Sequence, residues 1–204
     1  MSRSKYCYTG SPDNIIEIVK SATNKQRASG LAWYDEDRLF AAGLADDYGY
    51  DVELIAAVIS ALSQANGWSN NKRATFKVVS NHAAGKKNWW QWNAWIKNAV
   101  KKAFYILENG STEIATPKTR DFAKVIADPN NPYTVVVDRW AYRAWVDDIN
   151  NASSQQVSDK NYERIAVDYR IAAHELGLLP SQCQAIAWVV IRDKILGSRV
   201  AAYD

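Results

Sequence analysis

Apolar residues recur along most of this chain at the three- and four-residue spacing of amphipathic helices. The pattern predicts a helix that opens at residue 12, one over 31–48 and one that residue 51 caps and whose apolar residues run over 54–62. Further helices are predicted over 70–82, 89–107, 117–128, from 139 onward, 158–176 and up to 195. Residues 54–62 are apolar nearly all round, which is typical of a central buried helix. Residues 132–137 are the one β-like run, too isolated to build a sheet, so we expect an extended connector. The fold class predicted is all-α.

Several helix starts carry recognisable capping signals. Ser11-Pro12 and Thr116-Pro117 each place a capping hydroxyl before a proline that suits the first helical position. Ser181 with Gln184 has the spacing of a capping box for the last helix.

The charge distribution is uneven. Residues 54–107 contain no Asp or Glu and carry eight positive charges, so the rest of the chain sums to −5 within a total of +3. The basic residues are Lys72, Arg73, Lys77, Lys86, Lys87, Lys97, Lys101 and Lys102. Five of the nine tryptophans lie in the same segment (Trp68, Trp89, Trp90, Trp92 and Trp95). Interleaved basic and aromatic residues suit phosphate contact and base stacking, so nucleic acid is the leading candidate for a partner. The alternative is a solvated basic face over a Trp-rich core.

Other classes of protein are disfavoured. No run reaches the length of a membrane span, and the first residues lack the apolar core of a signal peptide. Two cysteines, Cys7 and Cys183, and two histidines are too few for a disulfide framework or a metal cluster. We therefore expect a cytoplasmic protein without a cofactor.

Short motifs then occur in an order that resembles the helix-hairpin-helix DNA glycosylases. Residues 54–64 followed by 70–75 resemble that family's buried helix and the start of its next helix. Lys118-Thr119 resembles the Lys-Thr of the hairpin. Val137-Asp138-Arg139 with Arg143 resembles the run around the catalytic aspartate. The pattern around these residues is also similar to small uncharacterised proteins of bacteriophages and bacteria.

This resemblance covers roughly residues 51–193 and has clear departures. Residues 112–117 replace the family's glycine-rich hairpin, Arg139-Trp140 replaces its Thr-His, and the iron–sulfur cysteines of many members are absent. The resemblance implies one domain over residues 1–204, with two helical lobes and a cleft between them. One lobe would span about 51–128 and the other 1–50 plus 129–204.

The resemblance also implies a reaction centre. Lys118 and Asp138 lie 20 residues apart, each at the start of a predicted helix. A carboxylate at Asp138 would stabilise an oxocarbenium-like sugar, and the Lys118 amine could form a Schiff base. Because the target base must leave the stack, Gln64 or Asn66 is the candidate side chain that fills its place.

The remaining predicted DNA contacts follow from charge and stacking. Trp68 or Trp140 would stack on the extruded base, and the expected phosphate contacts are Lys72, Arg73, Lys86, Lys87, Arg120, Arg139 and Arg143. Arg139 and Arg143 could instead pair with acids such as Asp147.

Each of these residues also has an ordinary structural explanation, which leaves two other functions open. Asp138 can be a plain helix cap, Lys118 a solvated surface lysine and Trp140 a core residue. The chain could then be a DNA-binding module without catalysis. It could also be an inhibitor or adaptor whose basic, Trp-rich face binds an acidic protein.

Overall fold

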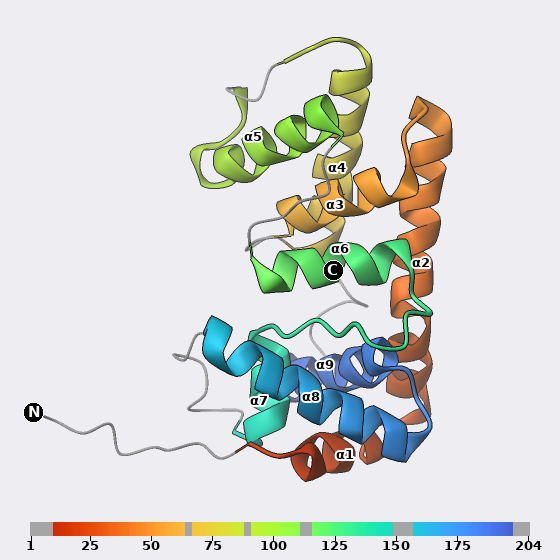
Figure 1. The fold of residues 1–204 in the computed structure, drawn as a ribbon, viewed down its shortest axis with the longest axis vertical. Coiled ribbons are helices and arrows are strands. Elements are labelled where there is room, and N and C mark those ends of the chain that lie inside the picture. The colour runs from red at the N-terminus through yellow and green to blue at the C-terminus, as the bar shows by residue number, and fades with distance from the viewer. Residues whose placement is uncertain (1–9, 64–66, 88–90, 111–115, 149–156, 198–204) are drawn as a thin grey trace, which may run out of the picture. The chain divides into compact units, whose positions relative to one another are not determined.

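The computed structural model describes residues 10–63, 67–87, 91–110, 116–148 and 157–197. Over these ranges the chain forms nine α-helices and no strand (Figure 1). The helices are α1 (Pro12–Lys20), α2 (Asn24–Tyr48), α3 (Val52–Leu62), α4 (Trp68–Ala83), α5 (Ala94–Asn109), α6 (Pro117–Ala127), α7 (Arg139–Val146), α8 (Asp159–Leu176) and α9 (Pro180–Leu196). The all-α prediction is confirmed. The glycosylase fold, with its lobes and cleft, stays a prediction.

Three predicted helix starts are confirmed by hydrogen bonds to the capping side chain, at Ser11, Thr116 and Asp138. Ser11 and Thr116 each accept a hydrogen bond from the backbone N–H three residues on, at 3.4 Å. Proline occupies the first position of both helices.

Three predictions about helix starts were wrong. Helix α5 begins at Ala94 rather than at residue 89. Helix α2 begins at Asn24 rather than near residue 31, because Thr23 and Gln26 form a reciprocal capping box. Helix α9 begins at Pro180, and the side chain that returns to its backbone is Gln182, which accepts from the Leu179 N–H at 3.1 Å. The predicted partner Ser181 is buried instead.

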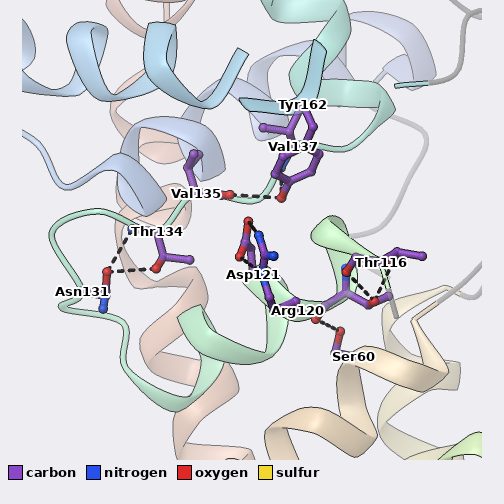
Figure 2. Close-up of polar contacts among 10 residues, drawn as sticks. Ser60, Thr116, Arg120, Asp121, Asn131, Thr134, Val135, Val137 and Tyr162 are labelled. Atoms are coloured by element: carbon purple, nitrogen blue, oxygen red, sulfur yellow. Dashed lines mark hydrogen bonds and ion pairs between the residues drawn. The ribbon is translucent and has the colours of Figure 1, made fainter. Parts of the chain in front are cut away.

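The described residues fall into two compact units. The first boundary between them lies within α2, after Ala32. The first unit contains residues 10–32 and 135–197. In it α9 packs against α1, α7 and α8, and all four contribute to one hydrophobic core (Figure 1). The connector before α7 is tied down by Tyr162, whose hydroxyl contacts the Val135 carbonyl and the Val137 N–H, each at 3.3 Å (Figure 2).

The second unit contains residues 33–134 and is built around α3. Every residue from Leu54 to Leu62 is at most 8% exposed, which confirms the predicted central helix. Two buried polar side chains join α3 to its neighbours. The Ser60 hydroxyl donates to the Thr119 carbonyl on α6 at 2.6 Å (Figure 2), and the Asn71 amide of α4 donates to the Ile59 carbonyl at 3.1 Å.

Candidate nucleic-acid-binding site

Within the acid-free segment α3 is buried, and the eight positive residues lie on α4, on α5 and at residues 86–87 of the connection between them. We call these parts the basic helix pair. Helices α4 and α5 pack against each other within the second unit. Five of its positive side chains are exposed, namely Arg73, Lys77, Lys86, Lys87 and Lys101. Lys72, Lys97 and Lys102 are half-buried. Four of the predicted phosphate contacts therefore belong to this pair, and all but Lys72 have exposed side chains, namely Arg73, Lys86 and Lys87.

Two of these lysines contact other side chains, with different effects on their positive charge. The Lys77 Nζ lies 4.7 Å from the centre of the Trp92 ring, a cation–π contact that keeps its charge. The Lys87 Nζ lies 2.8 Å from Oε1 of Glu108, the first acid after the segment. The hydrogen bond from Lys87 lowers the pKa of Glu108, so this carboxylate stays charged and partly neutralises Lys87.

Trp68 and Lys72 lie among aromatic rings. The Lys72 Nζ is 5.4 Å from the Phe40 ring and 5.5 Å from the Trp68 ring. The Trp68 ring in turn lies 6.2 Å from that of Trp33 and 6.0 Å from that of Phe122. Trp68 therefore has a packing role in the second unit, whatever it contributes to DNA.

A buried acid lies beside this aromatic cluster and was missed by the sequence reasoning. Asp37 on α2 is 1% exposed, and its Oδ2 has no hydrogen-bond partner among the described residues. Burial raises the pKa of this carboxyl to about 8, although Lys72 and the Trp68 indole act in the opposite direction. The only signal in the sequence is that Asp37 lies on the inward side of α2, between the buried residues Tyr34 and Ala41.

Among the side chains that the structure describes on the basic helix pair, the exposed aromatic ones are Phe76 and Tyr105 rather than tryptophans. Phe76 on α4 is 51% exposed and Tyr105 on α5 is 60% exposed. Trp92 is half-buried, and Trp89 and Trp90 lie outside the described residues. Helical spacing could have found both exposed rings, because Phe76 follows Arg73 by three positions and Tyr105 follows Lys101 by four.

Helix α6 holds the segment that resembles the hairpin Lys-Thr. Thr119 is buried and its carbonyl accepts from Ser60, whereas Lys118 beside it is half-buried. Arg120 is exposed, and its Nε lies 2.9 Å from Oδ1 of Asp121, so this predicted phosphate contact is paired with an acid (Figure 2). Gln64 and Asn66, the predicted filler side chains, lie outside the described residues, as do residues 112–115.

Asp138 is the N-cap of α7, as predicted. Its Oδ1 accepts hydrogen bonds from the backbone N–H groups of Trp140 and Ala141, both at 2.9 Å. The two bonds hold the carboxylate in one orientation at the positive end of the helix dipole.

The arginines after Asp138 differ in their surroundings. Arg139 is exposed, whereas Arg143 is 8% exposed and stacks on Trp140 with 4.6 Å between the guanidinium carbon and the ring centre. Burial, and then the charge of Arg139, lower the pKa of Arg143, while Asp138 raises it. Neither arginine forms an ion pair with Asp147 in the described part of the chain.

Trp140 packs against the core of the first unit, which agrees with an ordinary structural role for this side chain. Lys118 belongs to the second unit and Asp138 to the first.

Comparison with known proteins places the chain in a family. Residues 3–195 match a family of unknown function, DUF7178. The chain belongs to this family. No curated protein matches it. No solved structure matches it either.

Membership of DUF7178 assigns no chemistry to the chain, so its residues have to indicate one. Among the described residues, no helix is long and apolar enough to cross a bilayer. The same residues contain no group of three or more His, Cys, Asp or Glu placed to hold a metal ion. Cys183 is buried, and burial raises the pKa of its thiol to about 12, so it is unsuited to act as a nucleophile.

Proposed function

We propose that this protein binds DNA through the basic helix pair. The observation that supports the proposal is the set of five exposed positive side chains on a surface segment whose sequence contains no acid before Glu108. Phosphate contacts by lysine and arginine release condensed counterions from DNA and so provide affinity that is independent of sequence. The exposed Lys77, Lys86 and Lys101 are suited to this role.

Salt dependence tests this proposal directly. The affinity for a DNA duplex, measured by fluorescence anisotropy, should fall with salt at a log–log slope of about −0.9 for each phosphate contacted. Replacing Lys77, Lys86 and Lys101 together by Gln should make that slope shallower by about 3 and weaken binding across unrelated sequences. Lys124→Gln, at an exposed lysine on α6, is the single-site control.

If the protein does not bind DNA, or if salt does not weaken its binding, the proposal is contradicted.

We also propose that the protein excises bases from DNA, with Asp138 as the carboxylate and Lys118 as the amine that the resemblance implies. The support is the fixed orientation of the Asp138 carboxylate at a helix start, together with the resemblance of both segments to glycosylase motifs. Such a carboxylate is suited to stabilise positive charge that develops on the sugar when a base leaves. The half-buried Lys118 would attack the anomeric carbon, with loss of the base, to form a Schiff base.

Borohydride trapping on duplexes with damaged, modified and abasic sites tests this chemistry. We expect a covalent adduct that Lys118→Ala abolishes and Lys124→Ala, on the same helix, preserves. Asp138→Asn keeps an oxygen that can cap α7 but removes the charge, so it should lower the rate of base release at least about 100-fold without unfolding the protein. If the wild-type protein binds DNA but gives no adduct and releases no base from any of these duplexes, the catalytic proposal is wrong and the binding proposal stands.

A further inference from the structure

The exposed faces of α4 and α5 place aromatic rings among positive charges. On α4, Arg73, Phe76 and Lys77 are spaced so that they share one side of the helix, and all three are exposed. On α5, Lys101 and Tyr105 are one turn apart and also exposed. Each helix therefore presents an open aromatic ring close in sequence to positive side chains.

Phe76 is held in position before any ligand arrives. Its ring meets that of Tyr48 edge to face, with 6.3 Å between the centres and 72° between the planes. Half of the side chain nevertheless remains in contact with solvent. A ring that is braced on one side loses little conformational entropy when a planar ligand stacks on its open side.

We infer that the basic helix pair binds single-stranded DNA more tightly than duplex DNA, with Phe76 and Tyr105 as stacking platforms for the bases of the single strand. The inference rests on the proposed DNA binding and specifies the form of DNA. In a duplex the base faces are stacked on one another and only the phosphates and groove edges are available. A single strand offers phosphates to the lysines and an open base face to each aromatic ring. An acidic protein would satisfy the lysines but would not present a regular row of planar bases along its negative charges.

Three ligands of the same length distinguish base stacking from charge alone. We would measure the affinity of the full chain for fluorescein-labelled oligothymidine of about 16 nucleotides, for an oligomer of abasic residues and for a duplex. Oligothymidine should bind at least about tenfold more tightly than either the abasic oligomer or the duplex, because only its bases can stack on the two rings. A duplex that binds as tightly as oligothymidine overturns the inference. Phe76→Ala and Tyr105→Ala should each remove about tenfold of the oligothymidine affinity and leave the abasic affinity unchanged.

Two further variants distinguish the loss of an aromatic stacking face from a loss of the folded structure. Phe76→Leu keeps an apolar contact for Tyr48 but removes the aromatic face, so it should give the same loss of base-dependent affinity as Phe76→Ala. Tyr133→Ala removes an aromatic side chain that is 72% exposed after α6, outside the basic helix pair, and should change neither affinity.

The outcomes separate the two proposals. Equal affinity for oligothymidine and the abasic oligomer, with the expected salt dependence, overturns the stacking inference alone and leaves DNA binding in place. Phe76 and Tyr105 variants that weaken both ligands equally overturn it as well. Failure to bind any of the three ligands overturns DNA binding and the inference together.

Discussion

At the scale of single residues, the buried carboxyl of Asp37 in the second unit is costly to ionise. An ionised carboxylate with a partnerless oxygen is strongly disfavoured in an apolar environment, so burial keeps this group protonated at neutral pH. Lys72 lies near enough to oppose the effect but, in the described part of the chain, does not form an ion pair with Asp37 within 4 Å. The unfolded chain releases the same proton near pH 3.8, whereas the folded protein holds it to about pH 8.

The protein should therefore become less stable as the pH rises from about 4 to 8. In this window the folded state binds more protons at Asp37 than the unfolded state, so the free energy of unfolding falls by at most about 1.4 kcal/mol per pH unit. Asp37→Asn, which stays neutral, should remove this slope and raise stability at pH 8. Urea unfolding at several pH values measures the difference. Asp35→Asn, at an exposed acid on the same helix, is the control. Parallel pH profiles for wild type and Asp37→Asn would contradict the assignment.

At the scale of elements, α2 makes one unusually close helix contact. A Cβ built on Gly30 would lie 2.6 Å from Cγ1 of Ile186 and 2.7 Å from that residue's backbone N and Cα on α9. Because backbone atoms cannot move aside as a flexible side-chain end can, only glycine fits at this crossing. Gly43, further along α2, is exposed, and a Cβ added there would have no neighbouring atom within 4 Å.

Alanine at these two glycines should have opposite effects. Gly30→Ala should lower the free energy of unfolding by about 1–3 kcal/mol, because the added methyl group pushes α2 and α9 apart. Gly43→Ala should raise it by about 0.5–1 kcal/mol, because alanine restricts the unfolded chain and favours the helix. Thermal unfolding of the two variants beside the wild type gives the answer. A stabilising Gly30→Ala would show that α2 and α9 can separate at this crossing without cost.

At the scale of the whole molecule, the distribution of charge matters more than its sum. The net charge is only +3, and residues 35–53 carry seven acidic side chains against a single basic one, Arg38. These acids and the basic helix pair belong to the same unit, so its positive and negative charges largely cancel in total. A local cluster rather than the net charge would then attract DNA.

A charge-matched variant separates these two possibilities. Replacing the exposed Lys25, Lys160 and Lys194 of the first unit by Gln removes as much charge as the triple substitution in the basic helix pair. We expect the first-unit variant to keep the wild-type salt slope and an affinity within about twofold of the wild type, since its charges lie outside the proposed contact. Equal losses in the two triple variants would mean that net charge alone governs binding.

Local chemistry made most of the helices predictable from the amino-acid sequence. Ser11, Thr116 and Asp138 cap helices because their side-chain oxygens reach backbone N–H groups two or three residues away. The apolar residues of α3 favour burial whichever helices pack against them, and they are buried. The start of α2, which the prediction missed, also has a local signal in the sequence. This signal is the capping box formed by Thr23 and Gln26.

Only the tertiary structure decided which side chains are buried, paired or exposed. The sequence determined that residues 54–107 are basic and rich in aromatic residues. Packing decided that Trp68 joins an aromatic cluster while Phe76 and Tyr105 remain exposed. Packing also buried Asp37 and paired Lys87 with Glu108. These outcomes depend on contacts between residues that are distant in the sequence. The free energy of burying or pairing a side chain is set by the residues that surround it in the fold, so it cannot be assigned to either residue alone.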